Sequence, residues 1–139
     1  MARGDTEREI QRLAEQDGVE LSKQSVPWIN QRGHLGLPEV GDSDEQTKGL
    51  RKARSALRRI FLELGGDETE LAAGRPTRLP GDFIHEPSGT LVEVDESQHF
   101  TSFRRISLEL YPEGQELGFS LSEYEALCDK WSASSDGYF

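Results

Sequence analysis

Residues 79–100 contain two stretches with strand character and read Leu-Pro-Gly-Asp-Phe-Ile-His-Glu-Pro-Ser-Gly-Thr-Leu-Val-Glu-Val-Asp-Glu-Ser-Gln-His-Phe. The β-branched and aromatic residues predict strands over 79–86 and 90–95, and Pro87-Ser88-Gly89 between them is a turn signal. We therefore expect an antiparallel hairpin.

Three carboxylates accompany this hairpin. Side chains alternate faces along a strand, so Glu93 and Asp95 share one face of the second strand. Asp82 lies on the first strand, where the hairpin can bring it beside that pair. Neighbouring carboxylates repel each other, and a divalent cation such as Mg²⁺ or Mn²⁺ removes that cost. The pattern predicts a metal site formed by Asp82, Glu93 and Asp95, and the alternative is that the acids of the second strand simply face solvent.

The same residues resemble a known family pattern. Leu79-Pro80-Gly81-Asp82 followed by Leu91-Val92-Glu93-Val94-Asp95 resembles the PD-(D/E)xK superfamily of nucleases, which has an Asp at the start of one strand and Glu-x-Lys on the next. The continuation to His99-Phe100 is similar to the E-V-D-x-x-x-H-F signature of its very-short-patch-repair-like branch, which includes DUF559-type proteins and RAP domains. The resemblance covers residues 44–110 and implies a restriction-endonuclease-like core.

The resemblance also implies roles for individual residues. Asp82 and Glu93 would bind Mg²⁺ or Mn²⁺, whereas Asp95 stands where the superfamily has its lysine, the usual group for activating water. His99 then becomes the candidate general base or phosphate contact, and Gln98 a polar residue that lines the site. The superfamily core also continues into at least one further strand, and no strong strand pattern follows Tyr111.

The remaining sequence predicts mainly helices. Apolar residues at helical spacing predict helices over 5–16, 44–64, 101–110 and 121–131, with a short helical turn over 68–73. Asp42, Ser43 or Asp44 can cap the 44–64 helix, and Gly65-Gly66 ends it. The breakers within 22–43 predict a loop.

This order of elements predicts a mixed α/β fold. We expect an N-terminal helix and linker over 1–43, a core over 44–132 and a flexible tail over 133–139. Within the core, the 44–64 helix is expected to pack on the sheet through Leu57, Ile60 and Phe61.

The charge is strongly uneven along the chain. The 139 residues carry a net charge of -10, which argues against a protein that coats nucleic acid. Residues 48–59, however, hold six basic side chains and no acid, and Arg104-Arg105 form a second basic pair. In a nuclease, the phosphate contacts would come from Arg51, Arg54, Arg58 and Arg104. The alternative is a solvated helix face.

Other features limit the range of functions. Cys128 is the single cysteine, which excludes an intrachain disulfide and is typical of a reduced compartment; we expect it to pack within a helix. No apolar run has the length of a membrane span or resembles a signal peptide, so a cytoplasmic protein without a membrane partner is expected. His34 and His85 are not expected to be ligands.

The resemblance to PD-(D/E)xK nucleases, taken with the acid cluster and the basic residues, implies a metal-dependent nuclease that hydrolyses phosphodiester bonds of nucleic acid, with DNA as the expected substrate. The missing lysine and the net charge favour an alternative, a non-catalytic module with a degenerate site that binds nucleic acid or protein. A third reading is a domain that acts only in a homodimer or larger complex, through the 5–16 or 121–131 helix.

Overall fold

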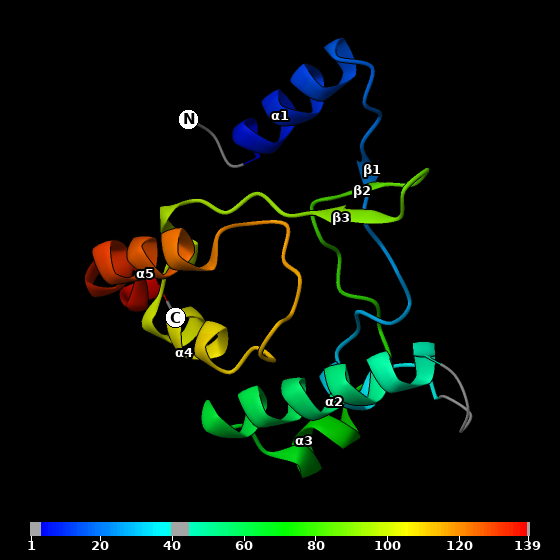
Figure 1. Cartoon of the computed structure of the whole chain (residues 1–139), viewed down its shortest axis with the longest axis vertical. Helices are drawn as coiled ribbons and strands as arrows, with labels where there is room; N and C mark the ends of the chain where they lie inside the picture. The colour runs from blue at the N-terminus through cyan, green and yellow to red at the C-terminus, as the bar shows by residue number, and fades with distance from the viewer. Residues whose placement is uncertain (1–3, 40–44, 139) are drawn as a thin grey trace. The chain divides into compact units, whose positions relative to one another are not determined.

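The protein has a mixed α/β fold, as the sequence predicts. The computed structural model describes residues 4–39 and 45–138, and in these ranges it contains five α-helices and one three-stranded antiparallel sheet (Figure 1). No strand follows the hairpin in the described part of the chain.

Contacts along the backbone group the chain into two units. Unit 1 combines Met1–Asn30 with Thr77–Val94, and unit 2 combines Gln31–Pro76 with Asp95–Phe139. The division into segments 1–43, 44–132 and 133–139 stays a prediction.

Unit 1 contains one helix and the sheet. Its elements are α1 (Asp5–Gln16), β1 (Ser22–Lys23), β2 (Phe83–His85) and β3 (Thr90–Val92), and the strands lie in the order β1-β2-β3. The predicted hairpin is confirmed, with Phe83 opposite Val92 and His85 opposite Thr90. Both strands are shorter than the predicted ranges. Pro80, just before β2, has no N–H to offer a neighbouring strand.

β1 corrects the prediction of a loop over 22–43. Ser22 pairs with Ile84 and Lys23 with Phe83, so this segment forms the third strand of the sheet. The Pro and Gly residues that suggested a loop begin only at Pro27, after the strand has ended. The short 3-10 helix η1 (Gly33–Gly36) is a second element inside the predicted loop, and residues 40–43 of that loop lie outside the described ranges.

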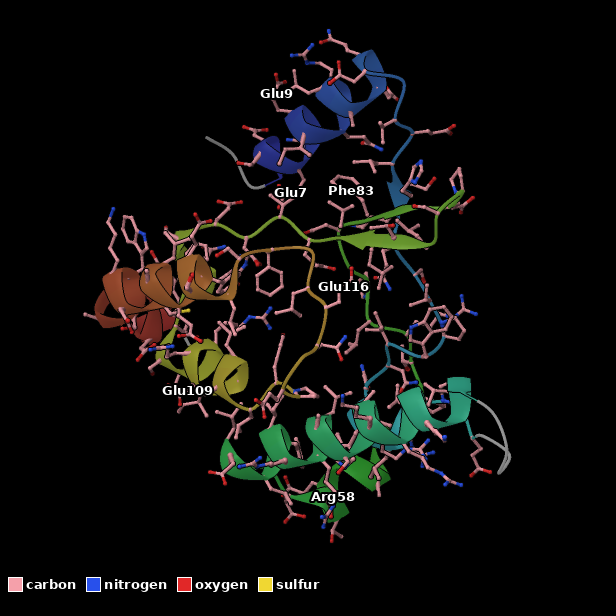
Figure 2. All side chains as sticks on the ribbon, in the orientation of Figure 1. Glu7, Glu9, Arg58, Phe83, Glu109 and Glu116 are labelled. Carbon is pink, nitrogen blue, oxygen red and sulfur yellow. The ribbon has the colours of Figure 1, made fainter. Side chains whose placement is uncertain are left out.

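A small apolar core holds unit 1 together. Leu21, Phe83 and Val94 are buried, and Ile10 and Ala14 of α1 pack against them. Phe83, labelled in Figure 2, is the residue of β2 that packs into this core. Removal of these apolar side chains from water is the main source of stability for such a small sheet, which could not stand alone.

Unit 2 begins with η1, α2 (Glu45–Glu63) and α3 (Glu68–Ala73). Gly65-Gly66 ends α2 as predicted: Gly65 has a φ of 83°, and the Gly66 N–H donates to the Phe61 carbonyl at 2.9 Å. Only glycine adopts that left-handed conformation at little cost. The predicted capping residues Asp42, Ser43 and Asp44 lie outside the described residues.

Inside unit 2, α2 packs against η1. The ring of Phe61 lies 5.5 Å from the ring of His34, while Leu57 remains 44% exposed. The sheet belongs to unit 1, so the packing of this helix on the sheet stays a prediction.

The second half of unit 2 contains η2 (Ser97–His99), α4 (Ser102–Glu109), α5 (Leu121–Ser135) and η3 (Asp136–Tyr138). Thr101 caps α4, and Ser120 caps α5. The core is formed by Phe100, Leu108, Tyr124 and Cys128. Cys128 is fully buried, which confirms its predicted role in packing.

The C-terminal residues of α5 and η3 bind distant residues of unit 2. Helix α5 continues to Ser135, beyond the predicted end at residue 131. The Ser135 hydroxyl donates to the Ser97 carbonyl at 2.7 Å, and the Asp136 carboxylate accepts from the Ser102 N–H at 2.8 Å. These bonds join Ser135 to η2 and Asp136 to the start of α4, and the flexible tail over 133–139 stays a prediction.

No helix in residues 4–39 and 45–138 combines the length and the apolar composition needed to cross a bilayer.

Candidate functional site

Asp82 and Glu93 stand at one end of the β2–β3 hairpin. Since Phe83 pairs with Val92, these two residues are the next positions in the same register. The Val94 N–H donates to Asp82 Oδ2 at 2.7 Å, and this bond fixes the orientation of the carboxylate. The local strand alternation is retained, with Val94 buried and Glu93 exposed.

Gly81 lies where two side-chain oxygens come together. A Cβ atom at Gly81 would lie 2.4 Å from Gln24 Oε1 and 2.6 Å from Glu93 Oε1, too close for any other residue to fit without displacing them. Gly81 is not among the glycines with positive φ. Space, and not backbone conformation, therefore accounts for a glycine directly before Asp82.

Gln24 is a residue of this site that the sequence analysis missed. It lies in the segment predicted as a loop, although Val19 and Leu21 alternate with polar residues just before it, which is a weak strand signal. Its side chain is completely buried. Neither Oε1 nor Nε2 of Gln24 has a hydrogen-bond partner among the described residues.

The donor set at this end of the hairpin fits a divalent ion. No three His, Cys, Asp or Glu side chains gather into a possible metal site within the described ranges. The oxygens that come together beside Gly81 are those of the Glu93 carboxylate and the Gln24 amide, and Asp82 is the next residue along the chain. Mg²⁺ is commonly held by one or two carboxylates and keeps waters or substrate phosphates in its other positions. Asp95 as a ligand stays a prediction.

Asp95 belongs to unit 2, where Tyr124 binds it. The Tyr124 hydroxyl donates to Asp95 Oδ2 at 2.7 Å. Burial, together with this hydrogen bond, raises the pKa of Tyr124 well above its ordinary range. Local sequence patterns could not predict this partner, because Tyr124 lies on a helix 29 positions further along the chain.

His99 also lies in unit 2, at the end of η2. Its Nδ1 accepts the Glu96 N–H at 3.0 Å, and the same atom is 3.4 Å from Asp95 Oδ1. A neutral imidazole whose Nδ1 accepts a hydrogen bond carries its proton on Nε2. Of the two predicted roles, this arrangement favours a donor to a phosphate oxygen over a general base. Gln98 is exposed on the same turn.

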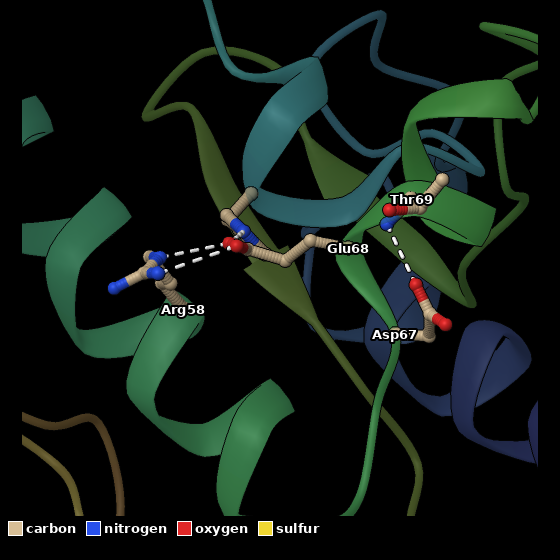
Figure 3. Close-up of polar contacts among 5 residues, drawn as sticks. Arg58, Asp67, Glu68 and Thr69 are labelled. Carbon is tan, nitrogen blue, oxygen red and sulfur yellow. Dashed lines mark hydrogen bonds and ion pairs between the residues drawn. The ribbon is translucent and has the colours of Figure 1, made fainter.

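Arg54 and Arg58, both predicted phosphate contacts on α2, bind other parts of unit 2. Arg54 Nη2 donates to the carbonyls of Leu37 and Pro38, at 3.3 and 3.0 Å. Arg58 Nε donates to Glu68 Oε1 at 2.8 Å, a pairing drawn in Figure 3. Arg51 is exposed on α2. The sequence could show the basic cluster but not which of its members pair with other parts of unit 2.

Arg104 is held against an aromatic ring. Its Cζ lies 5.3 Å from the centre of the Tyr124 ring, and its Nε is buried without a hydrogen-bond partner in the described part of the chain. This geometry is that of a cation–π contact, which stabilises the α4–α5 region.

The other two histidines have local partners. His34 is buried, with Nε2 at 2.9 Å from Glu68 Oε1, and His85 Nδ1 lies 2.6 Å from Ser88 Oγ. Glu68 thus binds both Arg58 and His34, and these two contacts join α3 to α2 and to η1.

No protein-family model, curated protein or solved structure matches this chain. The resemblance to PD-(D/E)xK nucleases therefore rests on the residues quoted for it, and the case for a metal site rests on the geometry of Gln24, Gly81, Asp82 and Glu93.

Proposed function

We propose that this chain is a metal-dependent nuclease with a restriction-endonuclease-like core, which hydrolyses phosphodiester bonds in nucleic acid, with DNA as the expected substrate. One observation carries the proposal: Asp82 and Glu93 follow in register from the paired residues Phe83 and Val92, at adjoining ends of two antiparallel strands. This is the placement that the PD-(D/E)xK pattern assigns to its metal-binding acids.

Asp82 and Glu93 are the residues that would hold the ion. A bound Mg²⁺ or Mn²⁺ lowers the pKa of a coordinated water and neutralises charge on the scissile phosphate. The Val94 N–H keeps the Asp82 carboxylate in one orientation, so less conformational freedom is lost when a cation binds.

The roles of Asp95 and His99 in the reaction come from the family resemblance alone, because both residues belong to unit 2. With Nδ1 occupied by the Glu96 N–H, His99 offers its Nε2–H to a phosphate oxygen. Asp95 accepts a hydrogen bond from the Tyr124 hydroxyl, and its side chain occupies the sequence position where the superfamily has lysine.

Phosphate contacts outside the metal site are assigned to the exposed basic residues of α2. Arg51 and Lys52 are exposed on this helix. Such contacts position a strand without reading its sequence, and they weaken as salt rises. Arg51→Ala with Lys52→Ala should therefore reduce affinity and flatten its salt dependence.

The test is a cleavage assay with the purified chain on single-stranded and double-stranded DNA and RNA. Wild type should cut with Mg²⁺ or Mn²⁺ and not with a chelator, and Glu93→Gln should lose that activity. Glu86→Gln is the matched control, because Glu86 is an exposed acid of the same hairpin. Binding without cleavage under any divalent ion would replace the nuclease with the non-catalytic binding module, and absence of both would overturn the proposal.

A further inference from the structure

The backbone of Gln24 is held against the hairpin. Its N–H donates to the Asp82 carbonyl at 3.4 Å, and its carbonyl accepts from the Gly81 N–H at 3.3 Å. These bonds extend the pairing of β1 and β2 past the strand ends. They also fix the direction of the Gln24 side chain, which enters the interior and has no exposed surface.

A buried amide without partners costs free energy, because it gave up its hydrogen bonds to water on folding. Both polar atoms of the Gln24 side chain are buried without a hydrogen-bond partner among the residues that the structure describes. Native proteins satisfy nearly all such groups, and an exception calls for an explanation such as a bound ion.

The direction of the amide oxygen supplies that explanation. A Cβ atom placed on Gly81 would lie 2.4 Å from Gln24 Oε1 and 2.6 Å from Glu93 Oε1, so both oxygens approach the same side of this glycine. Two oxygen acceptors that approach one point repel each other, and a cation between them converts the repulsion into attraction. A glycine at position 81 leaves both oxygens room to approach, because it has no side chain.

We propose that Gln24 is a third protein ligand of the divalent ion, contributing a neutral oxygen beside the carboxylates of Asp82 and Glu93. This inference rests on the proposed metal site and extends it to a residue outside the family pattern quoted above. Amide and carboxylate oxygens together suit a hard cation such as Mg²⁺ or Mn²⁺. The neutral ligand leaves the charge of the ion balanced by two acids.

A purely structural role for Gln24 has different consequences. If the amide turned its N–H toward Glu93, the two side chains would satisfy each other without an ion. Replacement of Gln24 would then lower the stability of the metal-free protein and leave the affinity for metal unchanged. A ligand gives the opposite pair of results.

The experiment measures Mn²⁺ binding to the full chain by electron paramagnetic resonance of free Mn²⁺, beside thermal unfolding without metal. Gln24→Met keeps a long unbranched side chain and removes the amide. It should weaken Mn²⁺ binding by about 10- to 100-fold, the loss found when supporting groups of a metal site are removed. The melting temperature without metal should stay equal or rise, because no unpaired amide remains buried.

Gln24→Glu provides a second, independent variant. A buried third carboxylate should lower the melting temperature without metal and increase the stabilisation that saturating Mn²⁺ provides. If both Gln24 variants bind Mn²⁺ with wild-type affinity while Glu93→Gln loses Mn²⁺ binding, the role of Gln24 is overturned and the metal site is not. Absence of Mn²⁺ binding in wild type overturns the metal site itself, and the role of Gln24 with it.

Discussion

The Tyr124 hydroxyl donates a hydrogen bond of 2.7 Å to Asp95, and this bond joins helix α5 to the residue that follows the hairpin. Tyr124 is buried and packs edge-on against Phe100, with the ring centres 5.0 Å apart. The same ring carries Arg104 on its face. Tyr124 therefore combines an apolar contact, a cation–π contact and a charged hydrogen bond at one position in unit 2.

Tyr124→Phe should lower the free energy of unfolding by about 2 kcal/mol, the middle of the range for hydrogen bonds to charged groups. The ring and its packing remain, so the loss reports the hydroxyl and the carboxylate that it leaves without a donor. Urea unfolding measures the change. Tyr138→Phe is the control, since Tyr138 is 71% exposed. Equal effects of the two substitutions would contradict the importance of the bond to Asp95.

The pH dependence of stability at alkaline pH should also depend on Tyr124. Burial first, and then the hydrogen bond to Asp95, raises the pKa of Tyr124 above its ordinary value of 10.0. The folded state thus keeps a proton that the unfolded chain releases above pH 10, and stability falls as pH rises from there. In Tyr124→Phe this part of the decline should be missing, as measured by urea unfolding across that pH range.

Glu68 should determine part of the stability at acidic pH. Hydrogen bonds from Arg58, and secondly from His34, lower the pKa of the Glu68 carboxyl below its ordinary value of 4.5 (Figure 3). A depressed pKa in the folded state contributes stability above pH 4.5 that is lost as pH falls through the folded value. Glu68→Gln should therefore reduce stability at neutral pH and flatten the acid decline. Glu70→Gln, on the same short helix, controls for the charge change, and identical pH curves for the two variants would contradict the assignment.

The C-terminal residues should contribute to the stability of unit 2. The Asp136 carboxylate accepts from both the N–H and the hydroxyl of Ser102, at 2.8 and 2.5 Å, and so holds the start of α4. Deletion of residues 133–139 should lower the melting temperature clearly, and Asp136→Ala alone should cost about 2 kcal/mol. Deletion of residues 138–139 only is the control and should change little. If the longer deletion leaves thermal unfolding unchanged, the predicted flexible tail is the correct description.

Gly81→Ala tests the space beside Asp82. The added methyl group would meet Gln24 Oε1 at 2.4 Å and Glu93 Oε1 at 2.6 Å, so at least one of these oxygens must move. Mn²⁺ binding should weaken by about tenfold or more, in line with the disturbance of a metal site. Gly118→Ala is the matched control because nothing lies within 4 Å of the added atom there. Equal Mn²⁺ affinity in the two variants would show that the converging oxygens do not hold the ion.

Local patterns in the sequence were sufficient for most helices and for the hairpin. Helical spacing of apolar residues predicted α1 with its observed bounds and α2 to within one residue at each end. Alternation on both sides of Pro87-Ser88-Gly89 predicted the pairing of β2 with β3. In each case the decisive residues are neighbours in the chain, so the pattern itself contains the information.

The rest depends on pairs of residues that are far apart in the sequence. β1 has two residues and becomes a strand only because Ser22 and Lys23 meet β2. Gln24 enters the candidate site through that same pairing, and Asp95 acquires Tyr124 across 29 positions. The sequence shows Gly81 before Asp82 as part of a family motif. The reason why only glycine fits there becomes visible only with the positions of Gln24 and Glu93 in the structure.

The last prediction separates the two tasks of Asp82. Its carboxylate accepts the Val94 N–H at 2.7 Å, a structural task, and is assigned to metal binding, a functional one. Asp82→Ala removes both, so it should lose Mn²⁺ binding and also cost about 2 kcal/mol of stability, because the Val94 N–H is left without its charged acceptor.

Asp82→Asn separates these effects. The amide oxygen can still accept the Val94 N–H, so stability without metal should remain near that of wild type, whereas loss of the negative charge should abolish the thermal shift with Mn²⁺. Parallel unfolding curves with and without Mn²⁺ for wild type and both variants measure this. Equal metal-free stability of Asp82→Ala and wild type would contradict the structural task. A full Mn²⁺ shift in Asp82→Asn would show that the ion, if bound, is held elsewhere, because a neutral amide cannot replace the charge of a carboxylate beside a divalent cation.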